Sequence, residues 1–241
     1  MAKSSLIEWT DGTWNPWHGC IKVSPGCKQC YMYRDKARYG QDPKQVVRSR
    51  TTFYEPLRWK EPRLVFTCSW SDWFIEDADQ WRDEAWELIR STPQHTYQLL
   101  TKRIERVDDH LPEDWGEGYP NVWLGVSIES QDYVWRKELL QQVPSRVRFI
   151  SAEPLLGPIH FGSLRGIGWV ITGGESGPKA RPLSLDWVRS IREQCRETRV
   201  PFFHKQHGGT SRLEGTWGGR LLDGRTWDEF PVMRSLATAP L

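Results

Sequence analysis

Short runs of apolar and β-branched residues recur along the chain, and turn residues separate them from longer segments with a helical pattern. Each run is almost continuously apolar over four to seven residues, which is typical of strands buried on both faces of a parallel sheet. This pattern predicts six strands. They cover Leu64–Cys68, Thr96–Leu100, Val122–Ile128, Val147–Ser151, Trp169–Thr172 and Val200–Phe203.

The segments between these runs carry apolar residues at helical spacing. Counting from Trp81, apolar side chains fall at positions i, i+4, i+7 and i+8, which is one face of a helix. A similar pattern starts at Trp187, with Ser184 in the N-cap position before it. The predicted helices are Lys28–Tyr39, Asp79–Ser91, Gln131–Gln142 and Leu185–Thr198. Such alternation indicates an α/β protein of parallel βαβ units, either a full or partial barrel or an open doubly wound sheet.

Composition and charge narrow the class of protein. The 241 residues include 33 Lys and Arg against 31 Asp and Glu, a formal net charge of +2. This balance excludes a histone-like or polybasic protein and leaves local nucleic-acid contacts open. No apolar run approaches the ~18 residues of a transmembrane helix, and the first residues lack the apolar core of a signal peptide. We therefore expect a cytoplasmic protein without membrane association.

Three of the five cysteines lie within eleven residues, at Cys20, Cys27 and Cys30. In a reducing compartment, such a cluster favours metal or iron–sulfur ligation over disulfides. A [4Fe–4S] cluster with three thiolates would leave one iron open to a small molecule. Structural zinc, with His18 as fourth ligand, and ordinary reduced thiols are the alternatives. Cys195 and Cys68 match small buried apolar residues, and Cys68 also stays a candidate fourth thiol.

Polar and ionisable residues follow the predicted strands at their carboxyl ends. In βα architectures this rim is where functional sites are built. The sequence therefore predicts a site at the rim, close to the cysteines. Its candidate residues are Ser69, Ser71, Asp72, Lys102, Arg103, Glu129, Glu153, Gly173, Gly174, Glu175, Lys205 and His207.

A three-cysteine loop ahead of βα units resembles the radical S-adenosylmethionine (SAM) superfamily. The first gap here, C-x6-C, is longer than the superfamily's C-x3-C, and Gln29 replaces the usual aromatic before the last cysteine. The chain more closely resembles a phage-associated three-Cys-motif family of unassigned function, through WNPxxGCxxxSPGCxxCY at Trp14–Tyr31. Further shared motifs over residues 6–209 are SxSD at Ser69–Asp72, SxEP at Ser151–Pro154, GGES at Gly173–Ser176 and KQxG at Lys205–Gly208.

This resemblance implies a radical SAM-like partial (β/α) barrel of about six to seven parallel strands over residues 1–209. Residues 210–241 would form a C-terminal extension that packs on the barrel. Cys20, Cys27 and Cys30 would hold the cluster at the top of the barrel. One electron, from a reductant such as a flavodoxin or ferredoxin, would cleave SAM to methionine and a 5′-deoxyadenosyl radical that abstracts hydrogen from a substrate.

The resemblance also suggests which rim residues would contact SAM. Ser69, Ser71 and Asp72 follow the first strand after the cluster, where superfamily members contact the SAM amino group. Gly173-Gly174-Glu175 spells a SAM-binding motif, although it occurs late in the chain. Lys102 could clamp a carboxylate, and Glu129 and Glu153 could contact the ribose or the substrate. The sequence identifies no catalytic residue.

The substrate is weakly constrained. Arginines and aromatic residues interleave between Tyr31 and Tyr54, a pattern that can clamp phosphates and stack bases. We expect a nucleic acid or nucleotide substrate. Two alternatives are a zinc-stabilised, non-catalytic module that binds nucleic acid or protein, and a cluster-based redox sensor. A bound zinc ion in place of iron would identify the first alternative. A cluster that does not bind SAM would identify the second.

Overall fold

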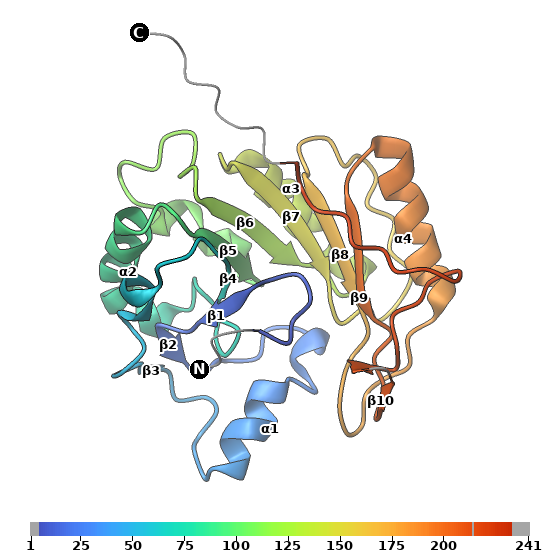
Figure 1. Ribbon diagram of the computed structural model, residues 1–241, viewed down its shortest axis with the longest axis horizontal. Helices are drawn as coiled ribbons and strands as arrows, with labels where there is room; N and C mark the ends of the chain where they lie inside the picture. The colour runs from blue at the N-terminus through green and yellow to red at the C-terminus, as the bar shows by residue number, and fades with distance from the viewer. Residues whose placement is uncertain (1–4, 214, 233–241) are drawn as a thin grey trace, which may run out of the picture.

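The computed structural model describes residues 5–213 and 215–232 of the chain. A parallel sheet in the order β1-β4-β5-β6-β7-β8-β9 curls into a half-barrel (Figure 1). The predicted α/β partial barrel is therefore confirmed. The strands are β1 (Gly12–Trp14), β4 (Leu64–Thr67), β5 (Thr96–Thr101), β6 (Val122–Ser127), β7 (Val147–Ala152), β8 (Trp169–Gly173) and β9 (Phe202–Gln206).

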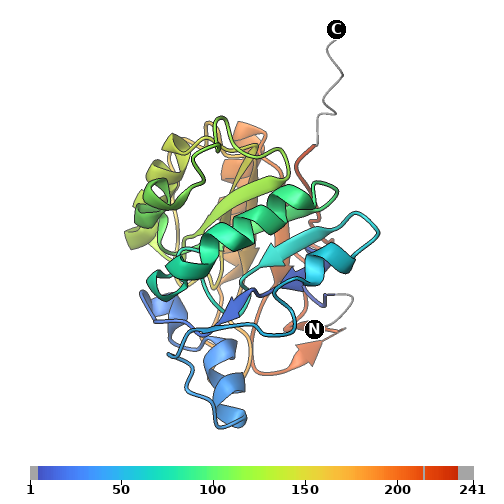
Figure 2. The same ribbon diagram turned by 90° about the vertical axis from the view of Figure 1, so that its left-hand side faces the viewer.

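Helices α2, α3 and α4 cover the outer face of the sheet, whereas α1 lies beyond the carboxyl ends of the strands (Figures 1 and 2). Their bounds are α1 (Tyr31–Arg38), α2 (Asp79–Ser91), α3 (Trp135–Gln142) and α4 (Leu185–Thr198). Small antiparallel ladders join β2 (Trp17–His18) to β3 (Val47–Arg48) and β10 (Arg212–Leu213) to β11 (Thr216–Trp217). Single 3-10 turns occur at Pro25–Cys27, Glu55–Arg58, Glu76–Ala78, Ile104–Arg106, Asp108–His110 and Gln131–Tyr133.

The predicted elements differ from the observed ones mainly at their ends. Helices α2 and α4 have the predicted bounds, but Ser184 makes no side-chain capping hydrogen bond. Strand β9 begins at Phe202 and continues through three polar residues that the apolar pattern left out. Two of them are bonded to β8 and the turn after it: His204 Nδ1 lies 2.9 Å from the Thr172 hydroxyl, and the Gln206 amide donates to the Gly174 carbonyl at 3.2 Å.

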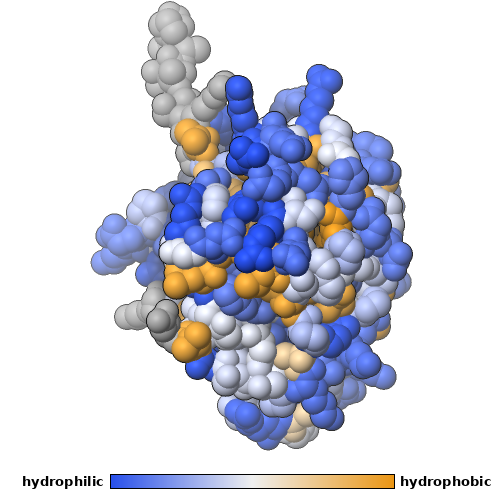
Figure 3. Space-filling model, turned by 90° about the vertical axis from the view of Figure 1, so that its right-hand side faces the viewer, coloured by the Kyte–Doolittle hydropathy of each residue, from blue (hydrophilic) through white to orange (hydrophobic). Residues whose placement is uncertain are grey.

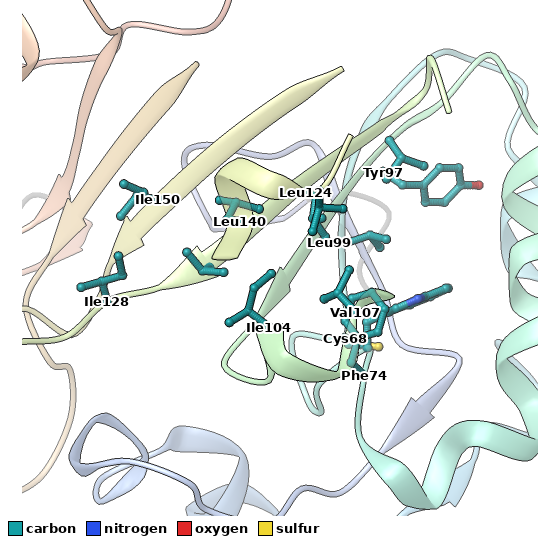
Figure 4. Packing of buried hydrophobic residues seen from close by; sticks show 14 of the residues in the cluster. Cys68, Phe74, Tyr97, Leu99, Ile104, Val107, Leu124, Ile128, Leu140 and Ile150 are labelled. Carbon is teal, nitrogen blue, oxygen red and sulfur yellow. The ribbon is translucent and has the colours of Figure 1, made fainter. Parts of the chain in front are cut away.

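The outer face of the sheet packs against the helices in one large apolar core (Figure 4). Figure 4 shows Leu99 and Leu124 from the sheet beside Ile104, Val107 and Phe74 from the loops. Cys68 lies in this core with 3 % of its surface exposed, and Cys195 is fully buried there. Both therefore match the prediction of small buried apolar residues.

The inner face carries a separate aromatic core at the amino ends of the strands. Its buried members are Trp9, Trp123, Phe149, Trp169, Ile171 and Phe203. Alternate residues of a strand face the same side, so this inner face continues toward the carboxyl ends through Ser127, Ser151 and Gly173. The inner surface of the half-barrel is thus apolar at one end and polar at the other.

A segment near the end of the described chain runs along the outer edge of β9. Asp228 forms an antiparallel bridge with Phe203, and the N–H of Glu229 donates to the Phe202 carbonyl at 3.2 Å. Phe230 then packs on Trp169, with ring centroids 5.1 Å apart. This segment pairs an edge strand that would otherwise present free backbone groups. Residues 214 and 233–241 of the predicted extension lie outside the described residues.

The surface on the β9 and α4 side is polar over most of its area, with apolar side chains scattered across it (Figure 3). Exposed residues of this kind include Leu213 and Leu221. Scattered apolar groups are ordinary on a protein surface. Among the described residues, no helix has the length and apolar character needed to cross a membrane.

Candidate metal centre at the strand ends

The cysteine loop, residues 19–30, joins β2 to α1 and lies against the carboxyl ends of the strands. Backbone bonds fix its start: Gly19 N–H donates to Trp70 O at 3.0 Å, and Cys20 N–H donates to Pro43 O at 2.9 Å. Gly19 has φ of 104°, and a Cβ there would overlap the Gln45 backbone, so this turn requires glycine. Backbone hydrogen bonds thus hold the loop in place up to its first cysteine.

The three thiols lie on this loop, and the charge of Cys27 acts on both Cys20 and Cys30. Burial raises the pKa of Cys20 to about 12, and the charges of Asp72 and Cys27 raise it further while Arg103 opposes them. Burial also raises the pKa of Cys30, against the N–H groups of the first turn of α1. All three thiols are only partly exposed. Cys20 and Cys30 are therefore protonated near neutral pH, and both must lose a proton to ligate a metal.

The thiols do not converge on a single point. Within residues 5–213 and 215–232, no three His, Cys, Asp or Glu side chains are placed to hold one metal ion. His18, the alternative zinc ligand, lies on β2 opposite Val47, and its buried Nδ1 has no hydrogen-bond partner. The Cys3His arrangement of a closed zinc site is not formed.

Asp72 and Arg103 connect the cysteine loop to β5. One Asp72 oxygen accepts from the Thr101 hydroxyl at 2.7 Å, and the other accepts from the Lys102 N–H at 2.9 Å and lies 3.1 Å from the Arg103 guanidinium. Arg103 in turn donates to the Ile21 carbonyl at 2.8 Å and reaches the Cys20 sulfur at 3.9 Å. Asp72 is therefore engaged in holding a cation beside the first thiol.

The two predicted serines hold the loop after β4 in place. The Ser71 hydroxyl donates to the Gly19 carbonyl at 2.6 Å. Ser69 exchanges bonds with the Asn15 side chain, whose oxygen also accepts from the Trp70 N–H at 2.8 Å. Tyr31 closes the arrangement by donating to the Ser69 carbonyl at 2.6 Å. The WNP and SxSD motifs thus interlock around the cysteine loop.

Glu129 supports the loop from the sheet side. It is fully buried, and its carboxylate lies 3.0 Å from the Arg136 guanidinium. Its other oxygen accepts from the Gly26 N–H at 3.4 Å, and a Cβ on Gly26 would touch it at 3.0 Å. A side chain at position 26 would therefore require the Glu129 carboxylate to shift by a few tenths of an ångström.

Glu175 supports the loop from the β8 side. Arg181 forms two bonds to its carboxylate, at 2.9 and 2.6 Å, and also donates to the Pro25 carbonyl at 3.0 Å. This bidentate pairing lowers the pKa of Glu175 even though burial opposes it. The predicted SAM ligand is therefore paired with an arginine that the sequence pattern did not single out.

Glu153 crosses the inner face in front of Gly173. It accepts from the Ser151 hydroxyl at 3.1 Å and pairs with Lys205 of β9 at 3.2 Å. A Cβ on Gly173 would overlap the Glu153 carboxylate, and one on Gly174 would overlap the His207 backbone. Because glycine has no Cβ, the Glu153 carboxylate and the His207 backbone can approach these two positions closely.

Lys102 differs from these engaged groups. Its ammonium has no acidic partner or hydrogen-bond acceptor among the described residues, and its charge acts on Cys30.

The residues that sequence reasoning missed are Asn15, Arg136 and Arg181. Asn15 stood in a recognised motif, but neither arginine carries a local signal, because its partner is defined only by the fold.

Comparison with known proteins adds a family. A family model described as "Protein of unknown function (DUF5131)" matches residues 4–231. No match was found among curated proteins or among solved structures.

Proposed function

The chain belongs to this family, since the match covers nearly all of its residues, and from its site we propose a radical SAM-like iron–sulfur enzyme. Cys20, Cys27 and Cys30 would hold a [4Fe–4S] cluster. The proposed reaction is the reductive cleavage of SAM and the abstraction of hydrogen from a substrate.

One observation carries this proposal. Three partly buried thiols lie on one loop at the carboxyl rim of a half-barrel, and cysteine thiolates are the ligands that hold iron–sulfur clusters. The donor set also fits chemically, because thiolates are the ligands of such clusters and Arg103 and Lys102 offset their negative charge.

When bound, the cluster supplies an open iron for SAM and the electron that yields methionine and a 5′-deoxyadenosyl radical. The chain's own part is to hold and shield these groups. Arg103 and Asp72 fix the first thiol, and the Glu129–Arg136 and Glu175–Arg181 pairs fix the loop between the thiols.

Lys102 is the group that we assign to the SAM carboxylate, because it is a rim cation with no acidic partner among the described residues. The Glu153–Lys205 pair lies on the inner face, where it can offer both a donor and an acceptor to ribose hydroxyls. Ser69, Ser71, Asp72, Glu129 and Glu175 act as positioning residues in this scheme.

The test is anaerobic purification, reconstitution with iron and sulfide, and absorption and electron paramagnetic resonance spectra with and without SAM. We expect about four irons per chain and a reduced-cluster signal that changes when SAM is added. Cys20→Ala, Cys27→Ala and Cys30→Ala should each lose the cluster, and the matched control His18→Ala should keep it.

Two outcomes would contradict the proposal. One zinc per chain that is lost in His18→Ala would indicate a zinc-stabilised binding module. A reducible cluster whose spectrum ignores SAM would indicate a redox sensor and remove the SAM reaction.

A further inference from the structure

Charge is unevenly distributed along a chain that is nearly neutral overall. Residues 19–50, which hold the cysteine loop and α1, contain eight Lys or Arg and two Asp. Residues 72–117, which hold α2 and the turns after β5, contain thirteen Asp or Glu and five Lys or Arg. A net charge of +2 therefore conceals a basic region around the candidate metal centre and an acidic region beside it.

The acids near the cysteines do not offset this basic region, because each is already paired. Asp72 pairs with Arg103, Glu129 with Arg136, Glu153 with Lys205 and Glu175 with Arg181. In contrast, Lys28, Arg38 and Lys179 are exposed and have no acidic partner among the described residues. The rim thus presents uncompensated positive charge to solvent.

These cations belong to one surface. Arg34 and Arg38 lie four positions apart on α1 and so share a helix face. That face meets the turn after β8, because a Cβ on Gly177 would overlap the Arg34 guanidinium. Lys179 follows in the same turn, and Lys28 is close enough to act on the Glu175 carboxylate. We call Lys28, Arg34, Arg38 and Lys179 the basic rim; among them Arg34 alone has an acidic partner in the described residues, Asp35 at 3.5 Å.

We propose that a single strand of nucleic acid binds along the basic rim, with its phosphates on Lys28, Arg38 and Lys179, and presents one nucleotide to the cysteine loop. This inference names the substrate class of the site proposed above, and it depends on that proposal only for the chemistry at the loop.

A strand fits better than a free nucleotide or a duplex. Lys28 precedes α1 and Arg38 is its last residue. Because the helix is about 12 Å long, a single phosphate cannot contact both cations. Tyr39 follows Arg38 with 70 % of its surface exposed, which offers a stacking face for a base beside a phosphate contact. A base stacked inside a duplex could not reach the loop without being extruded.

The experiment measures the fluorescence anisotropy of a labelled 20-nucleotide oligo-dT with the reconstituted protein, over about 50 to 200 mM salt. We expect Lys28→Gln/Arg38→Gln/Lys179→Gln to bind at least about tenfold more weakly and to reduce the salt slope by about 2. The control Arg58→Gln/Lys60→Gln/Arg165→Gln removes three exposed cations outside the rim and should leave both values unchanged.

A second arm separates nucleic acid from an acidic protein. Oligo-glutamate of equal charge should bind more weakly than oligo-dT, and Tyr39→Ala should weaken oligo-dT alone by about fivefold or more. Equal binding of the two polyanions, or equal loss in both triple variants, would overturn the inference; the former result would point to an acidic protein partner.

A third arm keeps this inference separate from the proposed reaction. Cys20→Ala/Cys27→Ala/Cys30→Ala should still bind oligo-dT, because Lys28, Arg38 and Lys179 make the phosphate contacts and the thiols make none. If that variant binds the strand while the wild-type chain takes up no iron, only the proposed reaction fails. If iron and SAM bind but oligo-dT does not bind even at about 50 mM salt, only the nucleic-acid inference fails.

Discussion

The two ends of the inner face of the half-barrel are built by the same strands and have opposite chemistry. At the amino end, Trp123, Phe149 and Trp169 pack against one another with almost no exposed surface. At the carboxyl end, the same face presents Ser127 and Ser151. The two sets stand two to four positions apart along each strand, which is roughly 7–13 Å. Stability and chemistry are thus separated along the strand direction.

The two ends are also held together by different forces. The amino end relies on aromatic packing, in which Trp169 contacts Trp9 at 6.2 Å and Phe149 at 5.9 Å between ring centroids. The carboxyl end relies on ion pairs such as Glu129–Arg136 that also hold the cysteine loop. Substitutions at the amino end should therefore affect folding alone, whereas those at the carboxyl end should affect folding and metal binding together.

The largest expected effect is at the aromatic end. Trp169→Ala should lower the free energy of unfolding by about 3–5 kcal/mol, because it leaves a cavity among large rings. Denaturant titration measures this change. The control Trp135→Ala, at a position 42 % exposed, should cost less than about 1 kcal/mol. An equally small loss in Trp169→Ala would show that this core does not set stability.

A smaller effect is expected at the buried ion pair of the rim. Glu129→Gln should lower the free energy of unfolding by about 2–3 kcal/mol, because it leaves the buried Arg136 charge uncompensated. Unlike Trp169→Ala, it should also reduce iron uptake per folded chain, since Gly26 of the cysteine loop rests on Glu129. Normal iron uptake by the folded variant would show that this ion pair affects stability alone, as the aromatic end does.

A pH effect is expected from His204. Burial lowers the pKa of this residue to about 3, with help from the charges of His207 and Arg220. The folded pKa lies below the unfolded value of about 6.5, so the stabilising contribution is complete above about pH 6.5. It is lost by about 1.4 kcal/mol per pH unit as the pH falls toward 3.

Equilibrium unfolding between about pH 6 and 4 measures this slope. His204→Asn should flatten it, because an amide does not titrate in this range. His160→Asn, at an exposed position, should retain the wild-type slope. Identical slopes for the wild-type chain and His204→Asn would assign the acid sensitivity to other groups.

The smallest effect on stability is expected at Lys102. Lys102→Met should change the free energy of unfolding by less than about 0.5 kcal/mol, because no partner is lost. It should weaken SAM binding about tenfold, which corresponds to one charge-assisted hydrogen bond. Isothermal titration with SAM measures this, with Lys60→Met as control. Unchanged SAM affinity would remove Lys102 from the site.

The sequence predicted elements where packing repeats at a fixed period. Both ends of helix α2 were predicted correctly, because each apolar side chain after Trp81 packs in the same core. Strand β1 escaped prediction because three residues are too few to show a period. Strand β9 was predicted too short, because its polar residues are buried by partners on β8 and the turns around it.

The candidate site was predictable in its location and less so in its contacts. The cysteines and the strand-end residues meet at one rim, as the topology of parallel strands requires. The partners of Glu129 and Glu175 were not foreseen, because Arg136 lies on a different element and Arg181 in an irregular turn. Which rim acids are free, and which are already neutralised, depends on contacts that no sequence spacing encodes.

The aromatic end of the half-barrel also bears on how the chain is made. Trp9, near the start of the described residues, and Phe230, near their end, both pack on Trp169. During synthesis from the amino terminus, this part of the core cannot be completed until residue 230 has left the ribosome. Until then, the nascent half-barrel exposes aromatic surface and an unpaired β9 edge, the two features that promote aggregation of an incomplete chain.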